Sequence, residues 1–182
     1  MYKPYTQKHG ENPEKKPTAK KLATQQQQVL QELFWAELVE IRDAVYQLTK
    51  AWPLLTAAAT SGLLKEFLTE CHVTNSIHFE RLKKISTVQG SDCSIKNCTA
   101  VKSIIGTIQN FSLTDDADTL IEIAAQKLLH YLAACYDGLV MMACTIHPTA
   151  AAPLNEMLTE IKNSNHKLFN ISMPADAKNS AA

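Results

Sequence analysis

The sequence predicts an all-α protein in which four long helices pack into one bundle. Three observations support this fold class. Four stretches carry apolar residues at alternating steps of three and four, which places each set on one helix face. Two of the links between the stretches are short, as in antiparallel helical hairpins, and the remaining link is long and contains one more short amphipathic segment.

The four apolar stripes define the expected core. They comprise Phe34, Leu38, Ile41, Val45, Leu48 and Trp52; Leu64, Leu68, Cys71, Thr74, His78, Leu82 and Ile85; Ile121, Ala125, Leu128, Leu132, Cys135, Leu139, Met142 and Ile146; and Leu154, Leu158, Ile161, Asn165 and Leu168. Four such faces close around a common interior.

The first two helices are expected to form a hairpin. The first runs from about Ala23 to Ala51, and Pro53 either ends it or opens the next helix, since proline suits a first helical turn. The second runs from Pro53 to about Val88, with an irregularity at Ser61-Gly62 near its start.

The segment from Thr99 to Phe111 predicts a short helix lying against the outside of the bundle, within a long crossover. The acidic residues Asp115 and Asp116 then suit the start of the third long helix, which continues to about Ile146. His147-Pro148 breaks it, and the fourth helix runs from about Ala150 to Asn170. One long crossover between the second and third long helices is the ferritin-like connectivity.

The ends of the chain are expected to be disordered. Residues 1–24 hold six lysines and two glutamates, with almost nothing apolar to offset the entropy of ordering. Residues 173–182 are polar and alanine-rich. The expected organisation is therefore a basic tail (1–24), a helical bundle (25–172) and a second tail (173–182).

Composition excludes several classes of function. A chain of 182 residues with 46% hydrophobic residues forms one domain with a sizeable core. Its net charge of zero argues against a nucleic-acid binder. No apolar run approaches the roughly 18 residues of a membrane span, and the N-terminus lacks the apolar segment of a secretory signal. We therefore expect a cytoplasmic protein with no membrane and no nucleic-acid partner.

Cysteine usage fits a reducing compartment. The chain has five cysteines and no C-x-x-C pair, so neither a disulfide framework nor a zinc site is indicated. Cys71 and Cys135 fall on core stripes, where a thiol behaves as a small apolar group. Cys93 and Cys98 lie in a polar connecting segment, either as a redox-active pair or as inert, solvated thiols.

Several segments together resemble the YciF-like family of bacterial ferritin-like proteins, whose function is unknown. The resemblance covers about residues 30–172. It is carried by Leu33–Pro53 (LFWAELVEIRDAVYQLTKAWP), Ala57–Ser61 (AAATS), His78–Leu82 (HFERL), Asn97–Ile105 (NCTAVKSII), Ile123–Tyr136 (IAAQKLLHYLAACY) and Leu154–Leu168 (LNEMLTEIKNSNHKL). What this resemblance implies is a ferritin-like bundle, a homodimer and an association with stress.

The resemblance also implies where a di-metal site would lie. Its carboxylate and histidine ligands fall on Val45, Thr74, His78, Leu129 or Leu132, Ile161 and Asn165. Only His78 keeps a ligand of the family pattern, and two divalent ions need several anionic ligands. We expect no metal and no other cofactor. The expected interior is a closed apolar core in which His78, Thr74 and Asn165 bond one another or a buried water.

Three functions remain open. The first is a non-catalytic bundle protein with a structural or interaction role that is related to stress. The second is an iron- or manganese-binding protein with relocated ligands drawn from His72, His78, Glu70, Glu80 and His130. The third is a small-molecule binder that uses the space vacated by metal, although the aliphatic substitutions would fill that space.

Two further interpretations concern activity and assembly. The chain has no phosphate-binding loop, nucleophile elbow or H-E-x-x-H motif, so no enzymatic activity is expected. Tyr131 and Tyr136 lie beside a core stripe, where a buried ring with a paired hydroxyl is the ordinary arrangement and a proton relay the alternative. Apolar residues off the first stripe favour a homodimer. They are Leu33, Trp35, Val39 and Tyr46.

Overall fold

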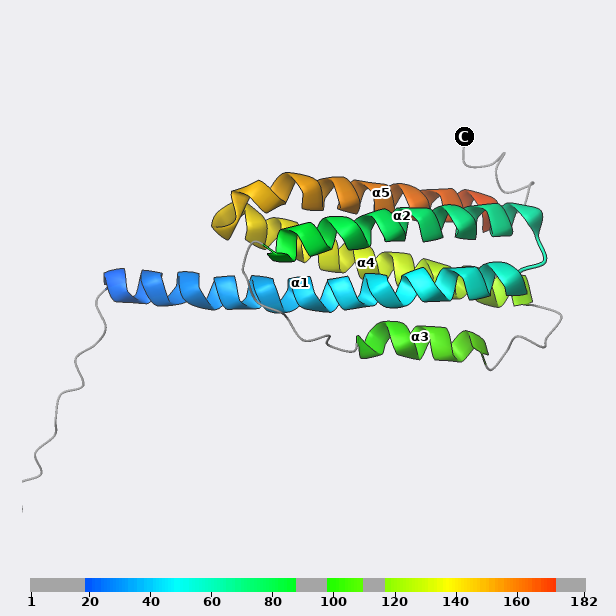
Figure 1. Cartoon of the computed structure of the whole chain (residues 1–182), viewed down its shortest axis with the longest axis horizontal. Coiled ribbons are helices and arrows are strands. Elements are labelled where there is room, and N and C mark those ends of the chain that lie inside the picture. Colours follow the sequence, from blue (N-terminus) through cyan, green and yellow to red (C-terminus); the bar gives the residue numbers. More distant parts are fainter. Residues whose placement is uncertain (1–18, 88–97, 110–116, 173–182) are drawn as a thin grey trace, which may run out of the picture.

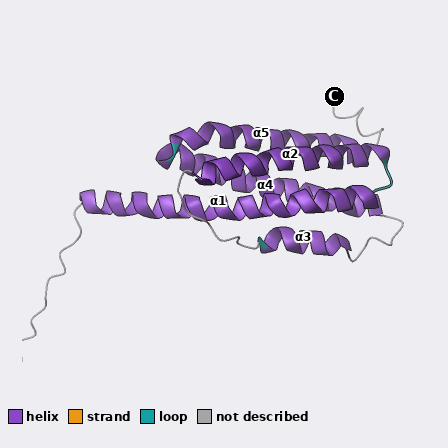
Figure 2. Ribbon diagram, in the orientation of Figure 1, coloured by secondary structure: helices purple, strands orange, loops and turns teal. Residues whose placement is uncertain are grey.

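The computed structural model describes residues 19–87, 98–109 and 117–172. Within these ranges it contains helices and their links but no strand (Figure 2), which confirms the all-α fold class. The helices are α1 (Ala19–Ala58), α2 (Gly62–Thr87), α3 (Thr99–Gln109), α4 (Ala117–Ile146) and α5 (Pro148–Ser172).

Four long helices surround one core. Helix α1 packs against α2 and α4, and α5 packs against α4 and α2, which closes a ring of four (Figure 1). Helix α3 lies outside this ring, against α1 and α4. Helices α2 and α4 run in the same direction (Figure 1), so the chain must travel back along the bundle between them, and α3 lies on that return path.

The apolar stripe of α1 forms its buried face as predicted, with Phe34, Val45 and Trp52 fully inaccessible to solvent. The stripes of α2 and α4 are buried at most of the predicted positions, but they differ by one residue at a few others. Asn75 is buried where Thr74 was expected, and Tyr136 is buried where Cys135 was expected. A straight helix has 3.6 residues per turn, so a strict seven-residue pattern drifts by about 20° per heptad relative to it. A step of four therefore replaces the expected step of three at these places, and the next stripe positions, His78 and Leu139, are buried as predicted.

Pro53 does not end α1, which continues to Ala58. Proline lacks the N–H that would bond the carbonyl of Thr49, but Ala51, Trp52 and Leu55 are buried on either side of it. Tertiary packing supplies most of the stability of helices in proteins. Packing of these buried residues therefore stabilises the helical conformation around Pro53 although one backbone hydrogen bond is missing. The expectation of a helix boundary at Pro53 is wrong.

The turn between α1 and α2 is closed by an acidic side chain from a distant part of the chain. Asp118, in the first turn of α4, accepts hydrogen bonds from the backbone N–H groups of Thr60 (2.7 Å) and Ser61 (2.8 Å) and from the Thr60 hydroxyl (2.6 Å). The Thr60 hydroxyl bond is the main cause of the lowered pKa of Asp118. Ser61 in turn caps α2, because its hydroxyl accepts a bond from the N–H of Leu64 at 3.4 Å.

The expected tails fall largely outside the described residues, namely at 1–18 and 173–182. Residues 19–24, which we expected in the N-terminal tail, instead belong to α1. Alanine, lysine and leucine, which supply most of this segment, are good helix formers, and this propensity explains why the helix begins sooner. The N-terminal part of α1 projects beyond the end of the other helices (Figure 1).

Helix α4 is the one described helix that is long and apolar enough to cross a membrane, by length and composition alone. In the fold its buried residues include Leu128, Leu129 and Leu132, and it packs against α1 and α5. Of its apolar 18-residue window, 33% is buried inside the structure.

Candidate functional site

The middle of the bundle contains one fully buried histidine with two side-chain partners. The Nε2 atom of His78, on α2, lies 2.6 Å from Oε2 of Glu160 on α5. Its Nδ1 atom lies 3.2 Å from the hydroxyl of Tyr136 on α4, and the two rings meet edge to face at 5.6 Å. His78 therefore joins three of the four long helices.

These partners determine the protonation pattern of the ring. A carboxylate only accepts hydrogen bonds, so Nε2 carries a proton and donates to Glu160. Nδ1 is then free to accept a bond from the Tyr136 hydroxyl. In this neutral tautomer, which is assigned from the partners, both ring nitrogens are satisfied. Burial lowers the pKa of His78 below its usual value of 6.5, although the bond to Glu160 opposes that shift.

Glu160 connects this buried ring to the surface. Its side chain is 40% exposed, and Nη1 of Arg81 lies 3.1 Å from its Oε1 atom. Burial alone raises the pKa of Glu160, but the bonds from His78 and Arg81 outweigh it and bring the pKa below its usual value. Glu160 thus remains charged. Its Oε2 atom accepts a hydrogen bond from His78, and Arg81 donates to both of its carboxylate oxygens.

The positions that resemblance assigned to a metal site do not converge on a set of ligands. Val45, Leu132 and Ile161 are buried aliphatic residues, with at most 1% of their surface exposed. Thr74 is only half-buried. Asn165 donates to the ring of His130 at 3.1 Å. The expected bonding of His78 with Thr74 and Asn165 is therefore wrong.

The alternative ligand set does not come together: His78 is buried, whereas Glu70, Glu80 and His130 are exposed. Glu70 pairs with Lys167 at 2.6 Å, and Glu80 pairs with Lys83 at 3.1 Å. His130 is exposed beside Asn165. Nδ1 of His72 is buried with no hydrogen-bond partner among the described residues. The described ranges contain no group of three or more histidine, cysteine or acidic side chains arranged to hold a metal ion.

A second buried polar centre attaches α3 to α1. Asp43 is 5% exposed, and its Oδ2 atom accepts bonds from the backbone N–H of Cys98 and from Nε2 of Gln47, both at 2.6 Å. Gln47 also donates to the Cys98 carbonyl at 3.3 Å. Cys98 immediately precedes α3, so these bonds fix the place where that helix begins.

The Cys98 side chain belongs to the same region. Its Sγ atom lies 3.2 Å from the hydroxyl of Tyr131, which donates to Oε1 of Glu40 at 3.1 Å. Cys98 is 2% exposed, so the expectation of a solvated thiol is wrong for this residue, while Cys93 lies outside the described residues. Burial raises the pKa of the nearby Cys135 to about 11, which disfavours its reactive thiolate form.

Sequence reasoning missed Glu160, Arg81 and Asp43. Arg81 follows His78 by three residues, a spacing that places the two side chains on neighbouring parts of one helix face. Glu160 immediately precedes the buried Ile161, which puts it at the edge of the α5 stripe. These positions could have placed both residues at the edge of the buried faces, but they do not indicate which atoms the side chains meet. Nothing in the pattern around Asp43 indicated that it would bind the backbone of a crossover.

The comparisons with known proteins agree with this architecture. Residues 29–181 match the family model described as a domain of unknown function, DUF892. No curated protein matches the chain.

Two solved structures are similar. YcfI from Rhodopseudomonas palustris, whose description proposes a structural role, is 28% identical, with a TM-score of 0.74 over 79% of this chain and 95% of that one. The E. coli stress protein YciF is 25% identical, with a TM-score of 0.70 over 78% and 93% of the two chains.

Proposed function

Because the chain belongs to the DUF892 family, we propose that it is a non-catalytic, ferritin-like bundle protein with a structural or interaction role in the response to stress. Its similarity to a stress protein and to a protein described as structural supports this role. On this proposal the bundle keeps the scaffold of a di-metal protein, but the site itself is degenerate.

The observation that carries the proposal is the chemistry at the middle of the bundle. Val45, Leu132 and Ile161 bring aliphatic groups where ligands would be required. An aliphatic side chain neither ligates a cation nor offsets its charge, and burying an uncompensated ion has a large desolvation cost. These side chains also occupy the interior, which argues against a ligand in a vacated metal cavity.

The polar groups that remain at this level are already engaged. Both nitrogens of His78 have partners, and Glu160 is bonded to His78 and Arg81. A metal ion at His78 would have to displace Glu160 or Tyr136 and would gain at most one carboxylate. The arrangement is therefore better suited to holding α2, α4 and α5 together than to binding iron or manganese.

Metal analysis tests the proposal directly. The full chain, without a histidine tag, is produced with iron and manganese supplied and is analysed for bound metal after mild chelation. We expect far less than one ion per chain, in the wild type and in His78→Ala alike. Near-stoichiometric metal that resists chelation and is lost in His78→Ala would contradict the proposal.

A variant provides the positive control. Replacing Val45, Thr74, Leu132 and Ile161 together by glutamate restores carboxylates at the positions that the family resemblance assigns to ligands. We expect weak metal binding to return in this variant if it folds, as judged by circular dichroism. Near-stoichiometric metal in the wild type, equal to that in the variant, would show that the native residues already form a site.

We also propose a cytoplasmic homodimer. Leu33 and Tyr46 of α1 are 48% and 36% exposed, whereas Val39 is buried and Trp35 packs against the core, so part of the apolar surface expected on α1 remains available. Light scattering should give about twice 20.2 kDa, and Leu33→Glu should weaken that association. A monomer at high concentration would exclude the dimer, and recovery outside the cytoplasmic fraction would exclude the proposed location.

A further inference from the structure

A surface cavity of about 370 Å³ lies where α2 ends and α5 begins. Arg81, Lys84 and Ile85 of α2 line one side, and His147, Ala150 and Pro153 line the other. The volume falls within the range of roughly 300–1,000 Å³ that is usual for small-molecule sites. Val45, Leu132 and Ile161 do not line the cavity, but Arg81 belongs both to the cavity and to the His78–Glu160 centre.

One wall of this cavity is held in place by aromatic packing. The His147 ring lies 5.4 Å from the ring of Trp35, edge to face, and 5.9 Å from that of Phe34. Its Nδ1 atom is 3.0 Å from the Thr149 hydroxyl. A wall fixed in this way is preformed, so a ligand would lose little affinity to reorganisation of the protein.

The cavity combines an apolar surface with two cations. Ile85, Ala150 and Pro153 supply aliphatic contacts. Among the described contacts, Arg81 uses only Nη1 for Glu160, which leaves other guanidinium N–H groups to donate. Lys84 is exposed and has no ion-pair partner within the described ranges. None of the described residues that line the cavity is acidic.

We propose that this cavity binds a free medium-chain aliphatic carboxylate. Its carboxylate would lie between Arg81 and Lys84, and its chain would cover Ile85, Ala150 and Pro153. A small inorganic anion would leave the apolar surface unused, and a neutral alkane would leave the two cations without a counterion. The proposal does not depend on the structural role or on the absence of metal.

The test is a titration of the full chain, labelled with nitrogen-15, with sodium octanoate below its critical micelle concentration. We expect saturable shifts of the backbone amides of Ile85, Thr149 and Ala150. Lys84→Glu should weaken binding by about tenfold or more, because it replaces an attractive charge by a repulsive one. The matched control is Lys83→Glu, which makes the same change on the next residue, where the ammonium pairs with Glu80.

Two controls distinguish a free carboxylate from a neutral amphiphile and from a lipid surface. Octanamide has the same chain without the charge and should bind at least about tenfold more weakly than octanoate. Vesicles that contain phosphatidylglycerol should not bind the protein through Lys84. The proposal is overturned by the absence of saturable shifts at these amides, by equal affinities of Lys84→Glu and Lys83→Glu, by equal affinities of octanoate and octanamide, or by Lys84-dependent binding to the vesicles.

Discussion

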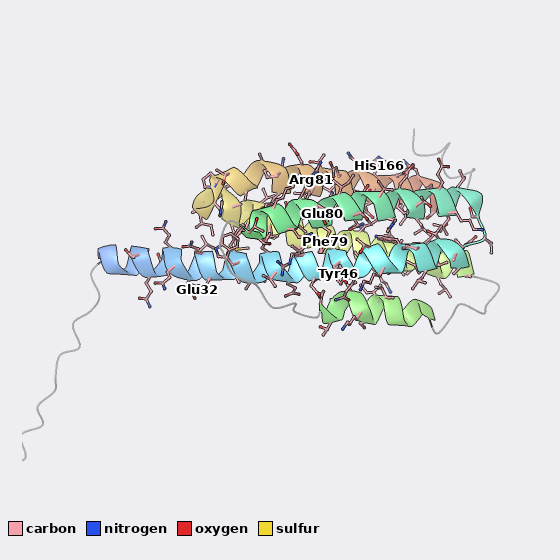
Figure 3. All side chains as sticks on the ribbon, in the orientation of Figure 1. Glu32, Tyr46, Phe79, Glu80, Arg81 and His166 are labelled. Carbon is pink, nitrogen blue, oxygen red and sulfur yellow. The ribbon has the colours of Figure 1, made fainter. Side chains whose placement is uncertain are left out.

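The His78 and Asp43 centres are both buried and polar, but they connect different kinds of structure. His78 links side chains on α2, α4 and α5, and its chain of contacts continues through Glu160 to Arg81 at the surface. Arg81 is labelled in Figure 3. Asp43 binds a backbone N–H, that of Cys98, and thereby holds the start of α3 against α1.

This difference shows two ways in which a bundle can use a polar group in its interior. The His78 centre joins helices that already share an apolar core, so it selects how they are aligned. Asp43 accepts a hydrogen bond from the buried backbone N–H of Cys98, in the link that precedes α3. A buried N–H in such a link has few other possible acceptors. We therefore expect the bundle to tolerate the loss of a bond at His78 better than the loss of the carboxylate at Asp43.

The largest loss of folding stability is expected for a polar group placed in the aliphatic interior, where it has neither a side-chain partner nor a backbone partner. Val45→Glu introduces a carboxyl group into the aliphatic interior and should destabilise the fold by about 3–5 kcal/mol. Urea unfolding followed by circular dichroism measures the change. The same substitution at Val29, which is 58% exposed on the same helix, should stay within about 0.5 kcal/mol of wild type. Similar values for the two variants would mean that the middle of the bundle accepts an acid.

Asp43→Ala should lower the free energy of unfolding by about 2–3 kcal/mol, because it leaves the Cys98 N–H and the Gln47 amide without their acceptor. Asp43→Asn retains an acceptor oxygen and should have a smaller effect. Hydrogen exchange should show α3 losing protection in the alanine variant before the long helices do. Equal loss throughout the chain would remove the distinction between the two polar centres.

Tyr136→Phe tests a single bond of the His78 centre. The substitution removes the hydroxyl that donates to Nδ1 but retains the buried ring, so a loss of about 1 kcal/mol is expected in urea unfolding. A loss as large as that of Asp43→Ala would show that the histidine centre is no more tolerant than the carboxylate centre.

The smallest effect is the pH dependence of the His78 centre. The pKa of His78 is lowered in the folded protein by burial, so the unfolded chain binds the proton more readily. Stability should therefore fall as the pH drops through about 6.5, and should stop falling below the folded pKa. His78→Gln should flatten this dependence between about pH 7.5 and pH 5.5, whereas His166→Gln, at an exposed position, should not. An unchanged slope in His78→Gln would assign the dependence to other groups.

The α1 stripe and the short helix before α4 were predictable from the sequence, because apolar spacing alone determines which face is buried. The register of α2 and α4 was less predictable. A one-residue drift separates Thr74 from Asn75 and Cys135 from Tyr136, and it depends on how straight each helix is. The burial of His78 was correctly expected, since drift had not displaced that position.

The partners of His78 and Asp43 could not be derived in the same way. The Glu160 contact spans 82 residues and the Cys98 contact spans 55. Each depends on the rotation and offset of two packed elements, and local spacing contains no information on either. A pattern on one helix predicts the face that is buried, but the atom that a side chain meets is a property of the assembled bundle.

The bond between Asp118 and the α1–α2 turn has a consequence for folding during synthesis. The first hairpin leaves the ribosome complete in sequence, but the side chain that closes its turn follows by 57 to 58 residues. Until α4 begins, the N–H groups of Thr60 and Ser61 can bond only water, so the hairpin remains free to open. Arrival of Asp118 would then couple closure of the first hairpin to docking of the second, which favours assembly of the four helices as one cooperative unit.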